Sequence, residues 1–405
     1  MAMYLELECR EGEEEFQTIF WQVLDYVISS VGIIGNLISI SILVKKEFRE
    51  TFHRLLLSLA VVDLIFIISV VIRNILRNVR QEKEQFLNQL NASIHRNGIN
   101  FTEDIFISEN TEDDTVQREL FEVRHEVIFL ENVTDIFSFE IRFMYFASIY
   151  FIVSISAERY FGVCYPIKSR VKGRKRFYLY FIPVLMLSAL IEIPKMITIL
   201  KQINNIEFSK QEKSFLEFYF DYAKPFMTIY LPLILLILLN TRIFHTIRNS
   251  RNSLRVNAGG GPGGGSGGSG GSDKERNFAT ILVSIVLLFL FTHSLRVLNQ
   301  IYRDSTDRIL KHCANKNLTP VIPRWLRTLN LLVEPAGLMN ASINFIIYCL
   351  AGTRFRTVLI RSARNTFKSS FSGSRNTEEY VLNSKKRICN PLLVPEADLM
   401  KSTEL

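Results

Sequence analysis

The stretch LLLSLAVVDLIFIISVVI, residues 55–72, contains a single charged residue, Asp63. Crossing the roughly 30 Å hydrocarbon core of a bilayer takes about 20 mostly apolar residues, because a helix rises about 1.5 Å per residue. Water is absent there, so the backbone N–H and C=O groups must pair within the segment, and a helix is the simple solution. We therefore expect residues 54–75 to form a transmembrane helix.

Six further apolar stretches follow the same rule on either side. The chain has 405 residues, of which 48% are hydrophobic and 12% aromatic, and its charged residues, 22%, lie mainly between the apolar stretches. The sequence therefore predicts an all-α membrane protein, a seven-transmembrane helix bundle. Its helices are expected at about residues 20–44, 54–75, 136–163, 177–200, 223–247, 275–302 and 325–350.

The basic residues indicate the orientation of this bundle. They gather after the first, third and seventh stretches and around the connection between the fifth and sixth. By the positive-inside rule these segments are cytoplasmic, which predicts a multi-pass plasma-membrane protein with an extracellular N-terminus. The net charge of +8 lies in these flanks, so it does not predict nucleic-acid binding. The glycosylation pattern Asn-x-Ser/Thr occurs in the predicted outer segments at Asn91, Asn100, Asn132 and Asn317.

The chain divides into a bundle at 20–351 and flanking segments. Residues 1–19 form a predicted extracellular segment, and residues 77–135 form a long, highly charged extracellular insertion. Within the insertion, Arg118–Val133 has the apolar spacing of a short amphipathic helix. Residues 259–272, GGGPGGGSGGSGGS, have the composition of a flexible linker in the third intracellular loop, either engineered or natural.

Two segments follow the seventh stretch. Residues 352–368 place apolar side chains opposite a basic face, which predicts an amphipathic helix in the membrane interface, in contact with lipid. Residues 369–405 form a polar cytoplasmic tail whose Ser and Thr residues are candidate phosphate acceptors; a plain disordered tail fits the composition equally well.

Several polar residues interrupt the apolar stretches, where they are costly and usually face the bundle interior. Asn36 and four others fit one shared site at mid-membrane depth, in which a carboxylate can bind sodium or a proton while hydroxyl and amide oxygens complete the shell. Hydrogen bonding that merely joins the helices explains the same residues equally well. The four are Asp63, Ser148, Asn340 and Asn344.

The third stretch ends in Glu158-Arg159-Tyr160, followed by a basic loop. An arginine at the inner edge of the membrane can pair with the glutamate beside it or with Glu275 at the start of the sixth helix. Breaking such a pair would release the sixth helix, as in a two-state switch. A snorkelling arginine with no switching role is the alternative.

Five motifs resemble the rhodopsin-like (class A) G-protein-coupled receptors, in order and on the corresponding helices. They are GN at 35–36, LAVVD at 59–63, ERYFGVCYPI at 158–167, FMTIYLP at 226–232 and NFIIY at 344–348. Within this class, FTHSLRVLNQIY at 291–302 and NASINFIIYC at 340–349 resemble invertebrate receptors for FMRFamide-type and related neuropeptides.

The resemblance implies roles for these residues. Asp63, Ser148, Asn340 and Asn344 would form a sodium pocket, the only cofactor site expected. Arg159, held at rest by Glu158 and Glu275, would engage a heterotrimeric G protein when the sixth helix moves outward. Tyr160 belongs to the same motif, and Tyr348 would act as a rotamer switch. A receptor kinase and arrestin would act on the tail.

The sequence also departs from the family pattern. The usual cysteines at the start of the third helix and in the second extracellular loop are missing, and we hypothesise instead a bridge between Cys9 and Cys313. The sixth helix has Thr292-His293-Ser294-Leu295 where many members have CWxP, and Phe345 stands where proline usually follows Asn344.

The predicted ligand is a peptide. Amine receptors carry an aspartate in the third helix about where Ile141 stands here. Mixed charge with aromatics suits a peptide, because carboxylates can hold a ligand arginine and amides can bond a terminal amide; several of these residues can instead pair with one another. The candidate ligand-binding residues are Glu140, Arg142, Tyr145, Glu192, Arg296, Asn299, Gln300, Arg303 and Glu334.

Three other functions compete with a coupled receptor. A receptor-like protein that binds without coupling has the same motifs. A transporter is less favoured, because the two halves show no internal repeat. An enzyme is not expected, because His293 has no plausible nucleophile or metal partner nearby.

Overall fold

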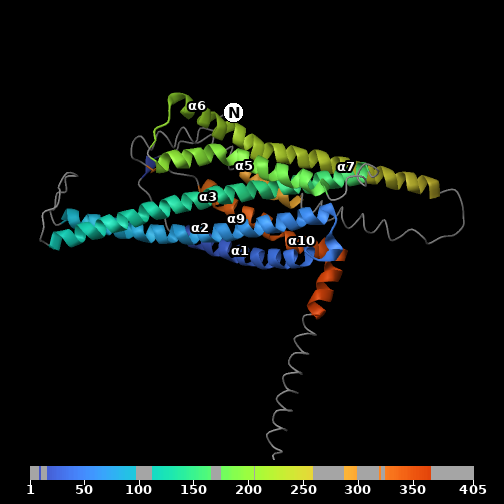
Figure 1. Ribbon diagram of the computed structural model, residues 1–405, viewed down its shortest axis with the longest axis horizontal. Helices are drawn as coiled ribbons and strands as arrows, with labels where there is room; N and C mark the ends of the chain where they lie inside the picture. Colours follow the sequence, from blue (N-terminus) through green and yellow to red (C-terminus); the bar gives the residue numbers. More distant parts are fainter. Residues whose placement is uncertain are drawn as a thin grey trace, which may run out of the picture. The chain divides into compact units, whose positions relative to one another are not determined.

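The computed structural model describes residues 9–10, 16–96, 112–165, 175–204, 206–258, 287–298, 319–320 and 324–365. The chain divides into two compact units, Met1–Ala351 and Gly352–Leu405. The first unit consists of long helices that follow the apolar stretches of the sequence (Figure 1). They are α1 (Phe16–Leu43), η1 (Lys46–Phe48), α2 (Thr51–Arg96), α3 (Glu112–Cys164), α5 (Lys175–Ile203), α6 (Lys210–Phe218), η2 (Tyr219–Ala223), η3 (Phe226–Tyr230), α7 (Leu231–Ala258), α9 (Arg324–Ser342) and α10 (Asn344–Ala351).

The described helices account for six of the seven predicted spans and for part of the seventh. Five are long and apolar enough to cross a membrane: Phe20–Leu43, Thr51–Ala92, Leu120–Cys164, Arg176–Ile203 and Lys210–Thr246. Helix seven passes the same test as a pair, Leu331–Ser342 with Asn344–Leu350, bent by 42°. Helix six is described over a shorter apolar segment, Leu287–Leu298. The predicted fold class, an all-α membrane bundle, is confirmed.

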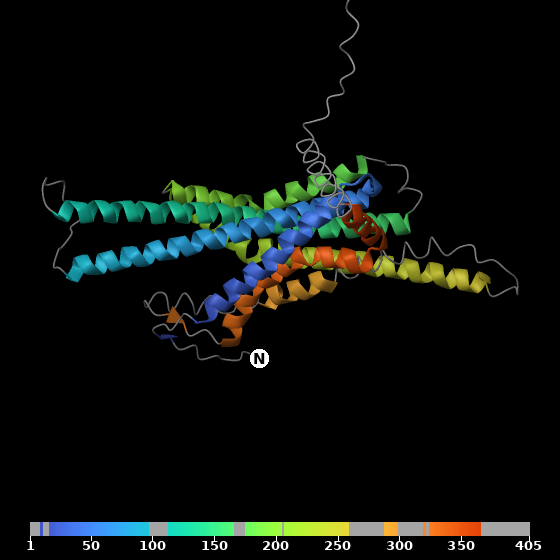
Figure 2. The same ribbon diagram turned by 90° about the horizontal axis from the view of Figure 1, so that it is seen from below.

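Helix α3 is central in this unit. It packs against α2, α5 and α7, while α1 packs against α2, α9 and α10. Figure 2 shows α1 crossing beside α9 and α10. The buried side chains Ile149, Phe151 and Ile155 lie on α3, each at most 1% exposed. Apolar side chains in these positions fill the interior, as hydrophobic packing requires.

Two glycines allow α1 to approach helix seven. A Cβ at Gly32 would collide with the side chains of Ser342 and Ile67, and one at Gly35 would lie 3.0 Å from Phe345 Cβ. Small residues let helix backbones approach closely in membranes. The glycines therefore fix the contact of α1 with α9 and α10.

Helix five begins earlier than the sequence predicts, at Lys210 instead of near residue 223. Ser209 starts it with a capping box, in which its hydroxyl accepts from Glu212 N and the Glu212 carboxylate accepts from Ser209 N. The helix then widens into two π-helical stretches, η2 and η3, which precede Pro225 and Pro232. Proline lacks an N–H and clashes with the carbonyl four residues back, and a π turn relieves that conflict.

The predicted insertion at 77–135 is helical over its described residues. α2 continues to Arg96 and α3 begins at Glu112, so the predicted short helix at 118–133 is part of α3. The two extensions run next to each other in Figure 1, and Figure 2 shows that they diverge toward their far ends. Charge keeps these residues out of the hydrocarbon core but does not oppose a helix, because Glu, Gln, Lys and Leu are good helix formers.

The paired extensions have the pattern of a two-helix coiled coil. Less exposed residues recur at spacings of three and four on both helices, and Lys83 Nζ lies 2.7 Å from Glu126 Oε2 across the pair. We call this element the α2–α3 hairpin. Its inner positions are Leu76, Arg80, Lys83, Leu87 and Leu90 on α2, and Leu120, Val123, Val127, Leu130, Thr134 and Phe137 on α3.

In the second unit, residues 353–365 form a helix in which Phe355 and Val358 are buried and Arg354, Arg356 and Arg361 are exposed. This agrees with the predicted amphipathic pattern. The linker at 259–272 and the tail at 369–405 lie outside the described residues, as do residues 1–8 and 11–15 of the N-terminal segment.

Candidate functional site

The first polar cluster lies at mid-bundle around Asp63, which is fully buried on α2. Ser148 on α3 donates a hydrogen bond to Asp63 Oδ1 over 2.6 Å. Asn344, the first residue of α10, donates to Asp63 Oδ2 over 2.7 Å. Three of the four residues predicted for a sodium site therefore meet directly, and Asn340 is buried one turn earlier.

Asn36 plays a different part from the one first considered. Its amide donates to Gly32 O and Ala341 O, both over 3.0 Å. It therefore joins the backbone of α1 to that of α9, where α1 and helix seven approach closely. This is the interhelical hydrogen bonding that the sequence left open as an alternative for Asn36, and no hydrogen bond among the described residues joins it to Asp63.

The Glu158-Arg159-Tyr160 motif lies near the end of α3, which we call the Arg159 end of the bundle. Glu158 forms an ion pair with Arg176 of α5, Nε to Oε2 at 3.1 Å, and both side chains are nearly buried. Arg159 lies over the ring of Phe52 on α2, with Cζ 3.3 Å from the ring centroid. The sequence did not reveal either partner, Arg176 or Phe52.

Two other residues of the predicted switch are described. Tyr160 contacts the rings of Phe161 and Tyr165. Tyr348 is 2% exposed and lies in α10, one turn beyond Asn344. Glu275 lies outside the described residues.

The opposite end of the bundle contains Asp25 of α1, and we call it the Asp25 end. Glu192 of α5 is buried there and forms two ion pairs. Its carboxylate accepts from Arg142 Nε over 3.1 Å and from Lys224 Nζ over 2.5 Å, and it is itself 0% exposed. This triad joins three membrane helices: α3, α5 (the fourth) and helix five, which runs from α6 through η2 and η3 to α7. Both Glu192 oxygens face cations of the chain, which is the internal pairing that the sequence left open for the candidate ligand-binding residues. Ligand binding by Glu192 stays a prediction.

Helix six reaches this end through His293 and Arg296. Tyr145 Oη lies 3.3 Å from His293 Nε2, and Arg296 lies over the Tyr145 ring at 3.8 Å. Gly337 on α9 makes room, because a Cβ there would lie 2.7 Å from Arg296 Nη2. Tyr145 and Arg296 were both predicted as ligand-binding residues, and the structure brings them into contact.

Glu334 on α9 is also paired within the chain. Arg73 of α2 donates to Glu334 Oε1, and Asn74 Nδ2 lies 3.5 Å from the same oxygen. The charges of both Arg73 and Glu334 act on the Asp25 carboxyl of α1. The sequence analysis did not predict Asp25 or Arg73 as site residues, although Asp25 is the lone charge in the apolar stretch at 20–44.

Of the remaining candidate ligand-binding residues, only Glu140 is described by the structure. Glu140 lies on α3 and is half-buried. Asn299, Gln300 and Arg303 lie outside the described residues.

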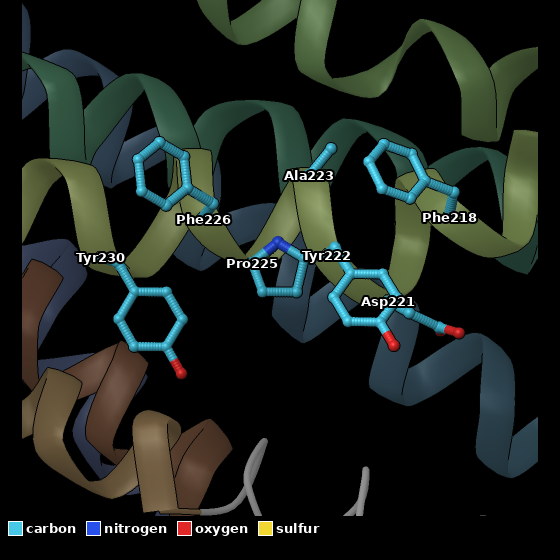
Figure 3. Close-up of a pocket in the computed structure, with 7 residues that line it drawn as sticks. All are labelled: Phe218, Asp221, Tyr222, Ala223, Pro225, Phe226 and Tyr230. Atoms are coloured by element: carbon cyan, nitrogen blue, oxygen red, sulfur yellow. The ribbon is translucent and has the colours of Figure 1, made fainter.

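An open aromatic hollow of about 510 Å³ lies along helix five. Figure 3 shows Phe218, Tyr222, Phe226 and Tyr230 projecting beside it, with Asp221 at one end. These four aromatics recur every four residues, a spacing that is visible in the sequence and could have predicted this hollow. Lys224 of the same helix points instead to Glu192.

Two predicted glycosylation positions are described. Asn91 is exposed near the end of α2. Asn132 lies inside α3, where the Thr134 hydroxyl of its pattern is 7% exposed and donates to Leu130 O over 2.7 Å. This environment disfavours modification of Asn132, because acceptor sites lie on accessible loops. Asn100 and Asn317 lie outside the described residues.

The N-terminal segment meets the segment before helix seven. Strand β1 (Cys9–Arg10) pairs antiparallel with β2 (Thr319–Pro320), with Cys9 opposite Pro320. The pairing brings Cys9 near the segment that follows Cys313 in sequence. Cys313 lies outside the described residues, so the Cys9–Cys313 bridge stays a prediction.

A membrane bundle with a buried carboxylate at its centre and charged clusters at both ends has the architecture of a seven-helix receptor. Residues 120–348 match the profile of the family described as 7 transmembrane receptor (rhodopsin family), more than half of the chain, and the protein belongs to that family. A search of curated proteins finds no similar sequence. The predicted family, the rhodopsin-like class, is thereby confirmed.

Proposed function

We propose that this protein is a plasma-membrane receptor with an extracellular N-terminus, which binds an amidated neuropeptide and activates a heterotrimeric G protein through outward movement of helix six. The observation that carries the proposal is the contact of helix six with α3 and α9 at the Asp25 end. His293 and Arg296 meet Tyr145 there, so a ligand that displaces these contacts acts directly on helix six.

The polar clusters at this end support a peptide ligand. Arg296 supplies positive charge beside Tyr145, and Arg142 and Lys224 together outnumber the one carboxylate of Glu192. Glu334 and Asp25 supply negative charge on α9 and α1. A peptide presents both charged and amide groups, which suits a pocket with separated charges.

The Arg159 end supports coupling. Arg159 is held by the Phe52 ring instead of being directed into solvent, and an arginine freed from such a contact is available to a G protein. We further propose that Asp63 binds sodium, because its carboxylate and the Ser148 hydroxyl are the oxygen donors that a hard cation prefers. Phosphorylation of the tail by a receptor kinase, with recruitment of arrestin, belongs to the same proposal.

The test is a screen of amidated neuropeptides, beginning with Phe-Met-Arg-Phe-amide, in cells that express this chain. G-protein dissociation is measured alongside binding of a labelled peptide. We expect wild type to bind and signal, and Arg159→Ala to bind at equal surface level without signalling. Binding without signalling by wild type would instead establish a receptor-like binding protein that does not couple.

A further inference from the structure

Arg73 of α2 and Glu334 of α9 form an ion pair, and the Asp25 carboxyl of α1 lies within electrostatic range of both charges. Counting along the helices, Arg73 lies ten residues beyond Asp63 and Glu334 ten residues before Asn344. At 1.5 Å per residue, Arg73 lies about 15 Å along α2 from Asp63, toward the Asp25 end.

The charges in this cluster do not balance. Two carboxylates face one guanidinium, that of Arg73; Arg77, one turn further along α2, is exposed and acts on Arg73 instead. Asp25 is 8% exposed, and its Oδ1 is buried with no hydrogen-bond partner among the described residues. Leaving a buried carboxylate oxygen without a donor costs several kcal/mol as an order of magnitude, so a donor that also carries positive charge would stabilise the site.

Glu334 gives the cluster an opening. Its side chain is 36% exposed, against 12% for Arg73. Glu334 is therefore the accessible partner of this ion pair, whereas Asp25 is 8% exposed. Glu334 keeps one carboxylate oxygen on Arg73, and Asp25 offers the free Oδ1.

We propose that Asp25 and Glu334 form a binding site for a positively charged group of the ligand, a guanidinium or an ammonium, which donates a hydrogen bond to Asp25 Oδ1. The site rests on the proposed function, in that the ligand enters from the extracellular side. It assigns to α1 a specificity-determining carboxylate and places the ligand's cation next to Arg73, away from Glu192.

The probes are three small amides added to the purified full chain: N-acetyl-arginine amide, N-acetyl-lysine amide and the uncharged N-acetyl-citrulline amide, at constant ionic strength. The readout is the thermal unfolding midpoint, which does not depend on a G protein. We expect both charged probes to raise Tm and the citrulline probe to leave it unchanged. In Asp25→Asn, the probe concentration for half of the shift should rise about tenfold, the loss of one charge-assisted hydrogen bond.

Two variants control this experiment. Asp25→Glu keeps the charge and should keep the response, while Glu82→Gln removes an exposed carboxylate of α2 and should respond as wild type does. An equal shift with the citrulline probe, an unchanged response in Asp25→Asn, or no effect of either cation on wild type would overturn the site. Asp25 would then be a carboxyl neutralised by its own proton or a structural group.

The outcome is separable from that of the proposed function. Stabilisation by the charged probes together with a silent peptide screen would retain the cation site and remove the signalling role. Signalling by a peptide, together with no effect of the charged probes on Tm, would retain the signalling role and remove the cation site.

Discussion

Asn344 donates a hydrogen bond to Asp63 over 2.7 Å, at the residue where helix seven resumes after its 42° bend. Ser148 of α3 donates to the other carboxylate oxygen. One buried carboxylate thus joins the second, third and seventh helices, and any cation or proton that binds it acts on all three.

Sodium should stabilise the protein through this carboxylate. At constant ionic strength, replacing potassium by sodium should raise the Tm of wild type, because a ligand of the folded state shifts unfolding by mass action. Asp63→Asn, which keeps the shape but removes the charge, should lose the sodium effect, and Ser148→Ala should weaken it. A sodium response that survives in Asp63→Asn would place the ion elsewhere.

Removing the Glu192 carboxylate should destabilise the bundle. Glu192→Gln leaves Arg142 and Lys224 side by side without their counter-charge, and breaking a buried ion pair in this way costs about 3–5 kcal/mol. The double variant Glu192→Gln with Lys224→Met should recover part of the loss. Thermal unfolding measures both, and equal Tm for Glu192→Gln and wild type would contradict the triad.

Contact between α1 and helix seven should depend on Gly32. Gly32→Ala places a methyl group against Ser342 and Ile67 and should lower Tm, because overpacking costs about 1–3 kcal/mol. Gly162→Ala is the matched control: nothing lies within 4 Å of its Cβ, so it should be neutral or slightly stabilising. Reversal of this order would show that α1 sits elsewhere.

The α2–α3 hairpin should open when its inner face is charged. Val123, 7% exposed, faces α2, and Val123→Asp should expose the hairpin to limited proteolysis on intact cells. Phe129→Asp on the outer face, where Phe129 is 67% exposed, should not. If the two variants are cleaved equally, the extensions do not pack on each other.

Ligand-independent signalling should rise when Arg159 loses its aromatic partner. Phe52→Leu removes a cation–π contact of about 1 kcal/mol, which corresponds to a roughly fivefold shift toward the state with Arg159 released. Phe161→Leu, at an exposed ring near the same end, serves as the control. Basal G-protein activation at matched surface expression gives the answer, and an unchanged basal level argues against Phe52 as a restraint.

The apolar stretches were sufficient to predict the helices and their order, because the cost of unpaired backbone groups in lipid leaves few alternatives. Charge, however, was a poor guide to helix ends. Both α2 and α3 continue past their predicted ends into the charged hairpin, and helix five starts at a capping box thirteen residues before its predicted start.

Single residues were predictable where their chemistry is distinctive. Asp63, Ser148 and Asn344 were expected together from polarity at equal depth in separate apolar stretches, and they hydrogen bond. The pairing of the other charges was not predictable, since Glu192 with Lys224 and Glu334 with Arg73 depend on which helix faces are neighbours.

The sequence by itself determined that this chain crosses a membrane as a helical bundle, because local composition decides which segments are stable in the hydrocarbon core. Its motifs separately indicated the family. Only the tertiary structure decided which buried charges neutralise one another. Electrostatic pairing acts over a few ångströms in space between residues as many as 261 positions apart, and it therefore singled out Asp25, whose Oδ1 has no partner among the described residues.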